Sequence, residues 1–322
     1  MFSACVESFS SNDPLSGLLL GQRPAPFVPD GWTTVSVRAA ALNHHDLWSL
    51  RGVGLGQDEL PRILGCDAAG VDADGHEVLV HAVICDPNWL GDETLDPRRS
   101  LLSERYEGTF AEQVAVPRRN VVPKPAGLSF EEATCLPTSW LTAYRMLFTN
   151  SELKPGDTVL VQGAGGGVST ALIMLARAAG LRVFATSRDE AKRSRALEIG
   201  AHEAVESGAR LPAKVDAVME TVGAATWSHS IRSLKPGGTV VISGATSGAK
   251  PSDAELTRIF YLSMKVVGST MGTREELLQL ARFLQVTGTR PLIDRVLPMD
   301  RAREGFAAMA GGDVFGKVVF TL

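Results

Sequence analysis

The chain has 322 residues, of which 44% are hydrophobic and 21% are charged, and its formal net charge at pH 7 is -4. This length is enough for two hydrophobic cores, and the composition is ordinary for a globular protein. The net negative charge argues against a nucleic-acid or anionic-membrane partner, and no apolar run reaches the length of a membrane span.

The first third of the chain is expected to be rich in β-strands. Residues 33–38, 77–83 and 111–116 alternate apolar and polar side chains or are continuously apolar, and glycine and proline residues separate them. These runs predict a barrel-like domain. After it, Ser129 and Glu132 have the spacing of a capping box, so a helix is expected to begin there and to lead to a second helical segment at residues 142–147.

The most informative pattern begins at residue 158. Residues 158–161 are apolar and β-branched, as in a strand buried on both faces, and residues 170–180 have apolar side chains three to four apart, as in a helix. A second strand is expected at residues 182–186. A strand, a glycine-rich turn, a helix and a strand form the unit that places a dinucleotide pyrophosphate on a helix N-terminus. The turn residues expected to bind it are Gly163, Gly165, Gly166, Gly167 and Val168.

The end of the second strand bears on the choice of cofactor. An NAD site usually has an acidic residue there for the ribose hydroxyls, whereas an NADP site has small polar and basic residues that accept a phosphate. Here Ser187, Arg188 and Lys192 occupy this region, so we expect NADPH. The alternative is that residues 189–198 form a solvated helix whose charges serve solubility.

Strands and helices continue to alternate, which predicts an α/β fold with a doubly wound parallel sheet. Further strands are expected at residues 215–219, 238–243 and 266–269, and Thr273 caps a late helix. A last strand, residues 316–322, lies outside this alternation. We therefore expect the chain to return to the first domain at its end.

Several segments together resemble the medium-chain dehydrogenase/reductase family, and most closely its zinc-free quinone oxidoreductase-like branch. The likeness covers nearly the whole chain and lies in residues 39–46, 64–70, 108–112, 136–144, 153–159, the glycine turn and 315–319. It implies a GroES-like catalytic barrel from residues 1–125 and 270–322, a Rossmann cofactor-binding domain over 126–269, and a small-molecule substrate between them. One departure is Ser169, which stands where the family usually has its last glycine.

The resemblance also bears on zinc. In zinc-using relatives a Cys occupies the position of Asn43, a His that of Cys66, and a Cys or similar ligand that of Thr138. Only Cys66 is a ligand in place, so we expect no catalytic metal. A rival metal site can be assembled from His44, His45, Cys66, Asp67, His81 and Cys85. Adjacent histidines on an extended segment point to opposite faces, however, so at most one would face inward.

Without a metal, the protein must supply orientation and hydrogen-bond donors while a nicotinamide supplies the hydride. We expect NADPH-dependent reduction of an α,β-unsaturated carbonyl compound or a quinone. Asn43 is the first choice of donor, and His45 is a possible proton donor. Asp46 is expected to orient this segment rather than to abstract protons, and Trp48 matches an aromatic position that flanks the substrate in relatives. The alternative is that Asn43 and His45 are structural and that Trp48 is a core residue.

Other expected cofactor contacts lie at strand ends or come from the resemblance. They are Thr142, Thr221, Val222, Gly244, Ala245, Thr246 and Lys317, of which Lys317 could instead be a surface residue. The family also implies a homodimer joined by Rossmann edge strands, for which residues 260–268 are apolar enough, although a monomer could bury them.

Two other functions remain open, a zinc-dependent alcohol dehydrogenase with atypical ligands and a non-catalytic NADPH-binding sensor. The four cysteines form no CxxC pair, and the N-terminus shows no basic region followed by an apolar core. We therefore expect a reduced, cytoplasmic setting. The sequence leaves the identity of the substrate open.

Overall fold

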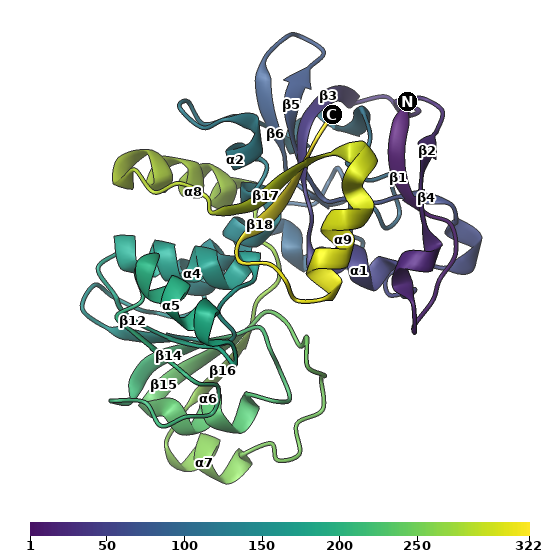
Figure 1. Cartoon of the computed structure of the whole chain (residues 1–322). Helices are drawn as coiled ribbons and strands as arrows, with labels where there is room; N and C mark the ends of the chain where they lie inside the picture. The colour runs from purple at the N-terminus through teal and green to yellow at the C-terminus, as the bar shows by residue number, and fades with distance from the viewer. The chain divides into compact units, whose positions relative to one another are not determined.

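The computed structural model describes all 322 residues, and the contacts between them divide the chain into two compact units (Figure 1). The first unit comprises Met1–Ser139 and Gly272–Leu322, and the second comprises Trp140–Met271. The C-terminal segment thus belongs with the N-terminal one, as the position of the last predicted strand indicated.

The first unit is built on antiparallel sheets. Its largest sheet has the strand order β10-β6-β5-β3-β18-β17, with β9 also paired to β3, and a smaller sheet has the order β2-β1-β4. The strands are β1 (Phe2–Val6), β2 (Leu18–Gln22), β3 (Trp32–Ala41), β4 (Arg62–Ile63), β5 (Asp67–Asp72), β6 (Glu77–Val80), β7 (Val83–Ile84), β8 (Ser100–Leu101), β9 (Gln113–Pro117), β10 (Val121–Pro123), β17 (Ile293–Pro298) and β18 (Lys317–Thr321). The α-helices are α1 (His44–Ser49), α2 (Phe130–Ala133), α8 (Arg274–Thr287) and α9 (Ala302–Ala310). Short 3-10 turns occupy Pro14–Gly17, Gln57–Glu59, Glu93–Leu95, Arg118–Asn120 and Met299–Arg301.

Three fully buried phenylalanines anchor the C-terminal segment to this unit. The Phe110 ring meets the rings of Phe306 and Phe320 edge-on, with centroids 6.0 and 5.3 Å away. Gly305 leaves room for them, because a Cβ there would lie 2.8 Å from the Phe320 ring. Strand β18 pairs antiparallel with β3 and parallel with β17, which confirms the predicted return of the chain.

Two details of this unit differ from the sequence-based expectation. The domain boundary was expected at residue 125, but residues 126–139 belong to the first unit because helix α2 packs against β3, β5 and β18. The strand expected at 77–83 is divided into β6 and β7. The Asn120 amide donates hydrogen bonds to the carbonyls of His81 and Val83, which takes the chain out of the ladder between the two strands.

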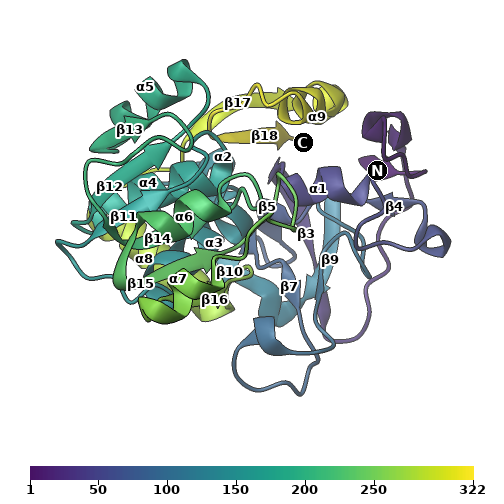
Figure 2. The ribbon, with the colours of Figure 1, turned by 90° about the horizontal axis from the view of Figure 1, so that it is seen from below.

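The second unit is a six-stranded parallel sheet with the order β13-β12-β11-β14-β15-β16. Helices α4 and α5 lie on one face and α6 and α7 on the other (Figures 1 and 2). The strands are β11 (Thr158–Val161), β12 (Arg182–Thr186), β13 (Glu203–Val205), β14 (Val215–Glu220), β15 (Leu234–Ile242) and β16 (Lys265–Gly268). The helices are α3 (Leu141–Tyr144), α4 (Gly167–Ala178), α5 (Glu190–Glu198), α6 (Trp227–Ser233) and α7 (Leu256–Tyr261), with a π-helical turn at Arg145–Thr149. A second π-helical turn, Leu136–Trp140, spans the boundary between the units in the sequence.

The predicted α/β architecture is confirmed in this unit. Val159, Leu160 and Val161 have no exposed surface, as the apolar composition of their strand required. Strand order reverses between β11 and β14, the point at which open α/β sheets bind their ligands. No helix of the protein combines the length and the apolar character needed to cross a membrane.

Candidate functional site

The glycine turn joins strand β11 to helix α4. Gly163 has a φ of 73° and Gly165 a φ of 136°, values that side chains with a Cβ rarely adopt. A Cβ on Gly163 would also lie 2.6 Å from Cγ2 of Val222. The backbone N–H groups of Gly163 and Gly165 are bonded inside the protein, to the hydroxyls of Thr186 and Ser169 at 3.2 Å each.

The remaining donors of the turn are at the start of helix α4. The helix begins at Gly167 with Gly166 as its N-cap, so the N–H groups of Gly166, Gly167 and Val168 belong to the first turn, where helices leave donors unpaired. An anion placed there also meets the positive end of the helix dipole. The substitution at Ser169 leaves these donors free, since its hydroxyl bonds to Gly166 O and receives Gly165 N–H.

The tip of strand β12 places basic groups beside this turn. Lys192 extends over Gly165, where a Cβ would lie 3.4 Å from the Lys192 Nζ. Ser187 is buried and Arg188 is exposed. The nearest acidic residue, Asp189, is the N-cap of helix α5, and its carboxylate accepts the N–H of Lys192 at 3.0 Å. One side of the turn is therefore basic, and Asp189 has a capping role.

The ends of strands β14 and β15 interlock next to the glycine turn. Ser247 N–H and its hydroxyl donate to Val222 O at 2.8 and 2.7 Å, and Thr246 N–H donates to Thr221 O at 3.4 Å. Gly223 is required for this contact, because a Cβ there would lie 2.8 Å from the Cα of Ala245. The structure thus brings together the predicted residues 221–222 and 244–246. Thr142 lies in the same unit, buried on helix α3.

Lys317 belongs to a buried polar cluster of the first unit. The residue is 1% exposed, so it is not a surface lysine. Its Nζ is 2.7 Å from Asn43 Oδ1, 2.8 Å from Leu42 O, 3.1 Å from Ser139 Oγ and 3.2 Å from Asp67 Oδ2. Because an ammonium has three hydrogens and four acceptors surround it here, Lys317 has no donor left for a ligand.

The same cluster engages the whole amide of Asn43. Its Nδ2 donates to Asp67 Oδ2 at 2.8 Å and to Ala41 O at 3.2 Å, while its Oδ1 accepts from Lys317 and from Ser139 at 3.0 Å. The ammonium beside it identifies which amide atom is the oxygen. Both amide hydrogens are therefore used within the protein, which favours a structural role for Asn43.

Asp46 holds the start of helix α1 in place. Its two carboxylate oxygens accept the N–H of Asn43 at 2.8 Å and the N–H of Gly65 at 3.0 Å. The side chain is fully buried, and burial raises its pKa to about 6, although His45 and the Asn43 N–H act in the opposite direction. These contacts agree with the predicted orienting role.

The segment at His44 and His45 is helical rather than extended, because Asp46 caps it. The side chains of the two histidines are therefore related by the rotation of one helical residue and do not point to opposite faces. His44 is exposed and packs edge-on to Trp48, and His45 is partly buried. The Nε2 of His45 is shielded from solvent and has no hydrogen-bond partner. Among the four predicted catalytic residues, His45 is thus the one with an unused buried polar atom.

The residues at the zinc-ligand positions of zinc-using relatives do not fit that metal. Asn43 is engaged as described, and the Cys66 thiol donates to Leu102 O at 3.2 Å. Burial, with Asp46 and Asp67 nearby, raises the pKa of Cys66 well above its usual value, which disfavours the thiolate that zinc requires. Thr138 adds only a neutral hydroxyl.

The rival set of metal ligands is dispersed as well. His81 is 2.9 Å from Gly272 O, and Cys85 receives a bond from Arg119. The side chains close enough to share an ion are instead Asp72, Asp74 and His76, in the turn between β5 and β6.

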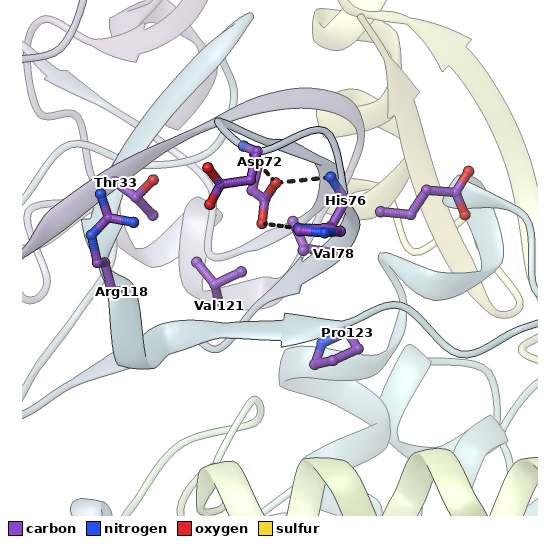
Figure 3. Close-up of a pocket in the computed structure, with 9 residues that line it drawn as sticks. Thr33, Asp72, His76, Val78, Arg118, Val121 and Pro123 are labelled. Atoms are coloured by element: carbon purple, nitrogen blue, oxygen red, sulfur yellow. Dashed lines mark hydrogen bonds and ion pairs between the residues drawn. The ribbon is translucent and has the colours of Figure 1, made fainter.

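That turn borders a pocket of about 500 Å³, which Figure 3 shows with His76 beside Asp72. Asp72 Oδ1 accepts the N–H groups of Asp74 and His76 at 3.0 and 2.9 Å, so this carboxylate has a structural role in the turn. The pocket is lined by Thr33, Asp72, Asp74, His76, Glu77, Val78, Arg118, Val121 and Pro123, none of them a predicted site residue.

Sequence reasoning did not single out Ser139, Gln162 or Glu220. Gln162 and Glu220 are polar residues that directly follow or end buried apolar strands, and that position is the signal that could have found them. Ser139 has no comparable signal.

Comparison with known proteins identifies both units. Residues 29–126 match the family model described as alcohol dehydrogenase GroES-like domain, and residues 167–285 match the one described as zinc-binding dehydrogenase. The GroES-like part of the sequence-based prediction is thereby confirmed.

Whole-length relatives are also found. The chain is 29% identical over 317 residues to a zinc-type alcohol dehydrogenase-like protein of Schizosaccharomyces pombe, covering 91% of each chain. It is 27% identical over 324 residues to an acryloyl-coenzyme A reductase of Sulfurisphaera tokodaii, covering 95% of this chain and 97% of that one. A crystal structure of an NAD-dependent alcohol dehydrogenase superposes with a TM-score of 0.92 at 33% identity, covering 100% of both chains.

Proposed function

This chain belongs to the medium-chain dehydrogenase/reductase superfamily, and from that premise we propose that it is an NADPH-dependent oxidoreductase that reduces an α,β-unsaturated carbonyl compound or a quinone without a metal ion. The observation that carries the proposal is the glycine turn with Lys192 over Gly165. The turn offers helix N-terminal donors to a pyrophosphate, and the adjacent cations suit the additional phosphate of NADPH.

The substrate class is inferred from the chemistry of the first unit. An alcohol or an unactivated carbonyl needs strong polarisation, which zinc-using enzymes obtain from the metal. The zinc-ligand positions here hold Asn43, Cys66 and Thr138, which do not fit zinc, so an already activated acceptor is favoured. The similarity to an acryloyl-coenzyme A reductase supports an activated C=C bond as the group reduced.

When bound, the reduced nicotinamide supplies the hydride. The residues of this chain then have to neutralise the charge that develops on the substrate oxygen. We assign this role to His45, since its Nε2 has no other partner, and we assign Asn43 and Asp46 to positioning helix α1. Trp48, partly buried on the same helix, is proposed to flank the substrate.

Cofactor choice is tested with Arg188→Ala and Lys192→Ala, and with Arg195→Ala as the matched control on the exposed face of helix α5. Dissociation constants for NADPH and NADH are measured by fluorescence titration. We expect the preference for NADPH to fall about tenfold in the first two variants and to be retained in the control. An unchanged preference in both variants, or a wild-type preference for NADH like that named for the 33% identical structure, would refute the phosphate site.

The reaction is tested by stopped-flow oxidation of bound NADPH with enones, enoyl thioesters, quinones and aldehydes. Turnover of the first three classes supports the proposal. Turnover of aldehydes alone, together with about one zinc ion per chain whose removal abolishes activity, would establish the zinc alcohol dehydrogenase instead. No turnover with any class would leave the NADPH-binding sensor.

We further propose that two copies associate through strand β16 of the second unit. This edge strand has an exposed Val266, and helix α7 beside it exposes 72% of Phe260 and 78% of Tyr261. Sedimentation equilibrium on wild type and Tyr261→Glu tests this. A dimer that Tyr261→Glu converts to a monomer is expected, and a monomeric wild type would refute the interface.

A further inference from the structure

Buried polar side chains form a connected chain of hydrogen bonds beneath the carboxyl edge of the parallel sheet. At one end, Glu220 closes strand β14 and is fully buried. Its Oε1 accepts the N–H groups of Val222 at 2.7 Å and Gly223 at 3.0 Å, and its Oε2 accepts the hydroxyl of Ser230 at 2.5 Å. The Thr226 hydroxyl is 2.8 and 2.9 Å from the two oxygens.

Gln162 connects this carboxylate to the glycine turn. Its Nε2 donates to Ser230 Oγ at 2.9 Å and to His229 Nδ1 at 2.9 Å, and its Oε1 accepts the hydroxyl of Thr186 at 2.6 Å. Thr186 in turn accepts the N–H of Gly163. The bonds therefore run without interruption from the backbone of Gly163 to that of Val222.

The direction of every bond in the chain follows from the donors present. Ser230 has one hydrogen, which it gives to Glu220, so it must accept from Gln162. The reverse orientation of the Gln162 amide would set its oxygen against the Ser230 oxygen with no hydrogen between them. His229 agrees, because its Nε2 donates to Ala209 O at 2.9 Å and leaves Nδ1 as an acceptor. The bonds that link Gly163 to Glu220 thus have one consistent set of directions.

The two backbone turns at the ends of this network lie at the edge where open α/β sheets bind their ligands. They follow β11 and β14, the neighbouring strands at which the strand order reverses. They also touch each other, as the close approach of Gly163 to Val222 shows. The first turn offers donors for a pyrophosphate, and the second lies where the nicotinamide half is expected.

We propose that Glu220, Ser230, Gln162 and Thr186 are positioning residues that set the spacing between these two turns, and so align the two halves of a bound dinucleotide. This inference rests on the proposed cofactor. In this proposal the four residues position the backbone turns and do not bind the cofactor directly. Each acts through a backbone N–H group or through the next side chain, and a purely structural role would change stability without distinguishing between whole and half cofactors.

The test compares NADPH with adenosine 2′,5′-bisphosphate, which is its adenosine half and does not reach the second turn. Ser230→Ala and Glu220→Gln break the network near that turn, and Ser228→Ala is the matched control on the same helix. Calorimetric titration should show NADPH binding weakened about tenfold in the two variants, with the half cofactor changed less than twofold. Thermal unfolding establishes that each variant is folded, and Ser230→Ala, the smaller change, keeps the test valid if Glu220→Gln unfolds.

A double-mutant cycle tests whether the chain acts as a unit. Thr186 and Ser230 meet only through Gln162, so in a connected network the loss of NADPH affinity in Thr186→Val/Ser230→Ala should be smaller than the product of the two single losses. Multiplicative losses, equal weakening of both ligands, or unchanged NADPH binding in folded variants would overturn the inference. Wild-type protein that binds neither ligand would instead refute the cofactor site, and this inference with it.

Discussion

The carboxyl group of Asp46 should make the stability of the first unit depend on pH in an unusual direction. Burial raises its pKa to about 6 from an ordinary value of 3.8. The folded state therefore binds the carboxyl proton more tightly than the unfolded state does. The stabilisation from this proton is present below pH ~4 and is lost as the pH rises through ~6. A difference of about two pKa units corresponds to about 3 kcal/mol, of which about 2 kcal/mol is lost between pH 4.5 and pH 7.5.

The assay is urea unfolding of wild type and Asp46→Asn across that pH range, followed by tryptophan fluorescence. The difference in unfolding free energy, wild type minus variant, isolates Asp46 from the other titrating groups. It should fall by about 2 kcal/mol from pH 4.5 to 7.5. Two N–H groups bond to the carboxylate and favour its charged form. A difference that rises with pH would show that these bonds outweigh burial and would refute the reasoning.

Three other predictions follow from the same unit. Lys317→Met leaves Asp67 buried without its cation and should lower the free energy of unfolding, measured in urea, by about 3–5 kcal/mol. The double variant Lys317→Met/Asp67→Leu should recover much of this loss. A cost below ~1 kcal/mol for Lys317→Met would contradict the buried pair. His45→Gln should lower kcat at least about 100-fold with an enone substrate while Tm changes little, and a kcat within threefold of wild type would rule out the proton-donor role. Dialysis against a chelator should leave kcat and the zinc content, measured by mass spectrometry, unchanged. The reason is that, of the three positions that hold zinc in relatives, only Cys66 has a side chain of a type that binds zinc. Loss of activity that zinc restores would disprove the metal-free proposal.

The nucleotide-binding half of this protein could be read from its sequence because its determinants are local. The strand, the glycine turn and the helix lie within residues 158–178, and the periodicity of their apolar side chains is set by the sheet and helix themselves. Gly163 and Gly165 are required by backbone angles and by close neighbours, which constrain the residue type directly. Such features leave a signature at short range.

The polar cluster of the first unit lacks such a signature. Lys317 is 250 residues from Asp67 and 274 from Asn43, and no spacing rule connects them. The resemblance placed Lys317 near the cofactor, whereas the folded chain surrounds its ammonium with four acceptors from distant segments. The two histidines are different, because Asn43 and Asp46 have the local spacing of a capping box, and this spacing could have predicted the helix that the structure shows there.

The two networks limit what is left for ligands. In the first unit, the polar atoms of Asn43, Asp46 and Lys317 bond to one another, to Asp67 and Ser139, and to the backbone. His45 Nε2 is the predicted catalytic group that remains unpaired. In the second unit, the internal bonds of Gly163 and Gly165 leave the start of helix α4 to receive an anion. Residues that sequence comparison would group together as site residues therefore divide into those that hold the backbone and those that face a ligand. Substitutions of the first kind should change stability and alignment, and those of the second kind should change chemistry or affinity directly.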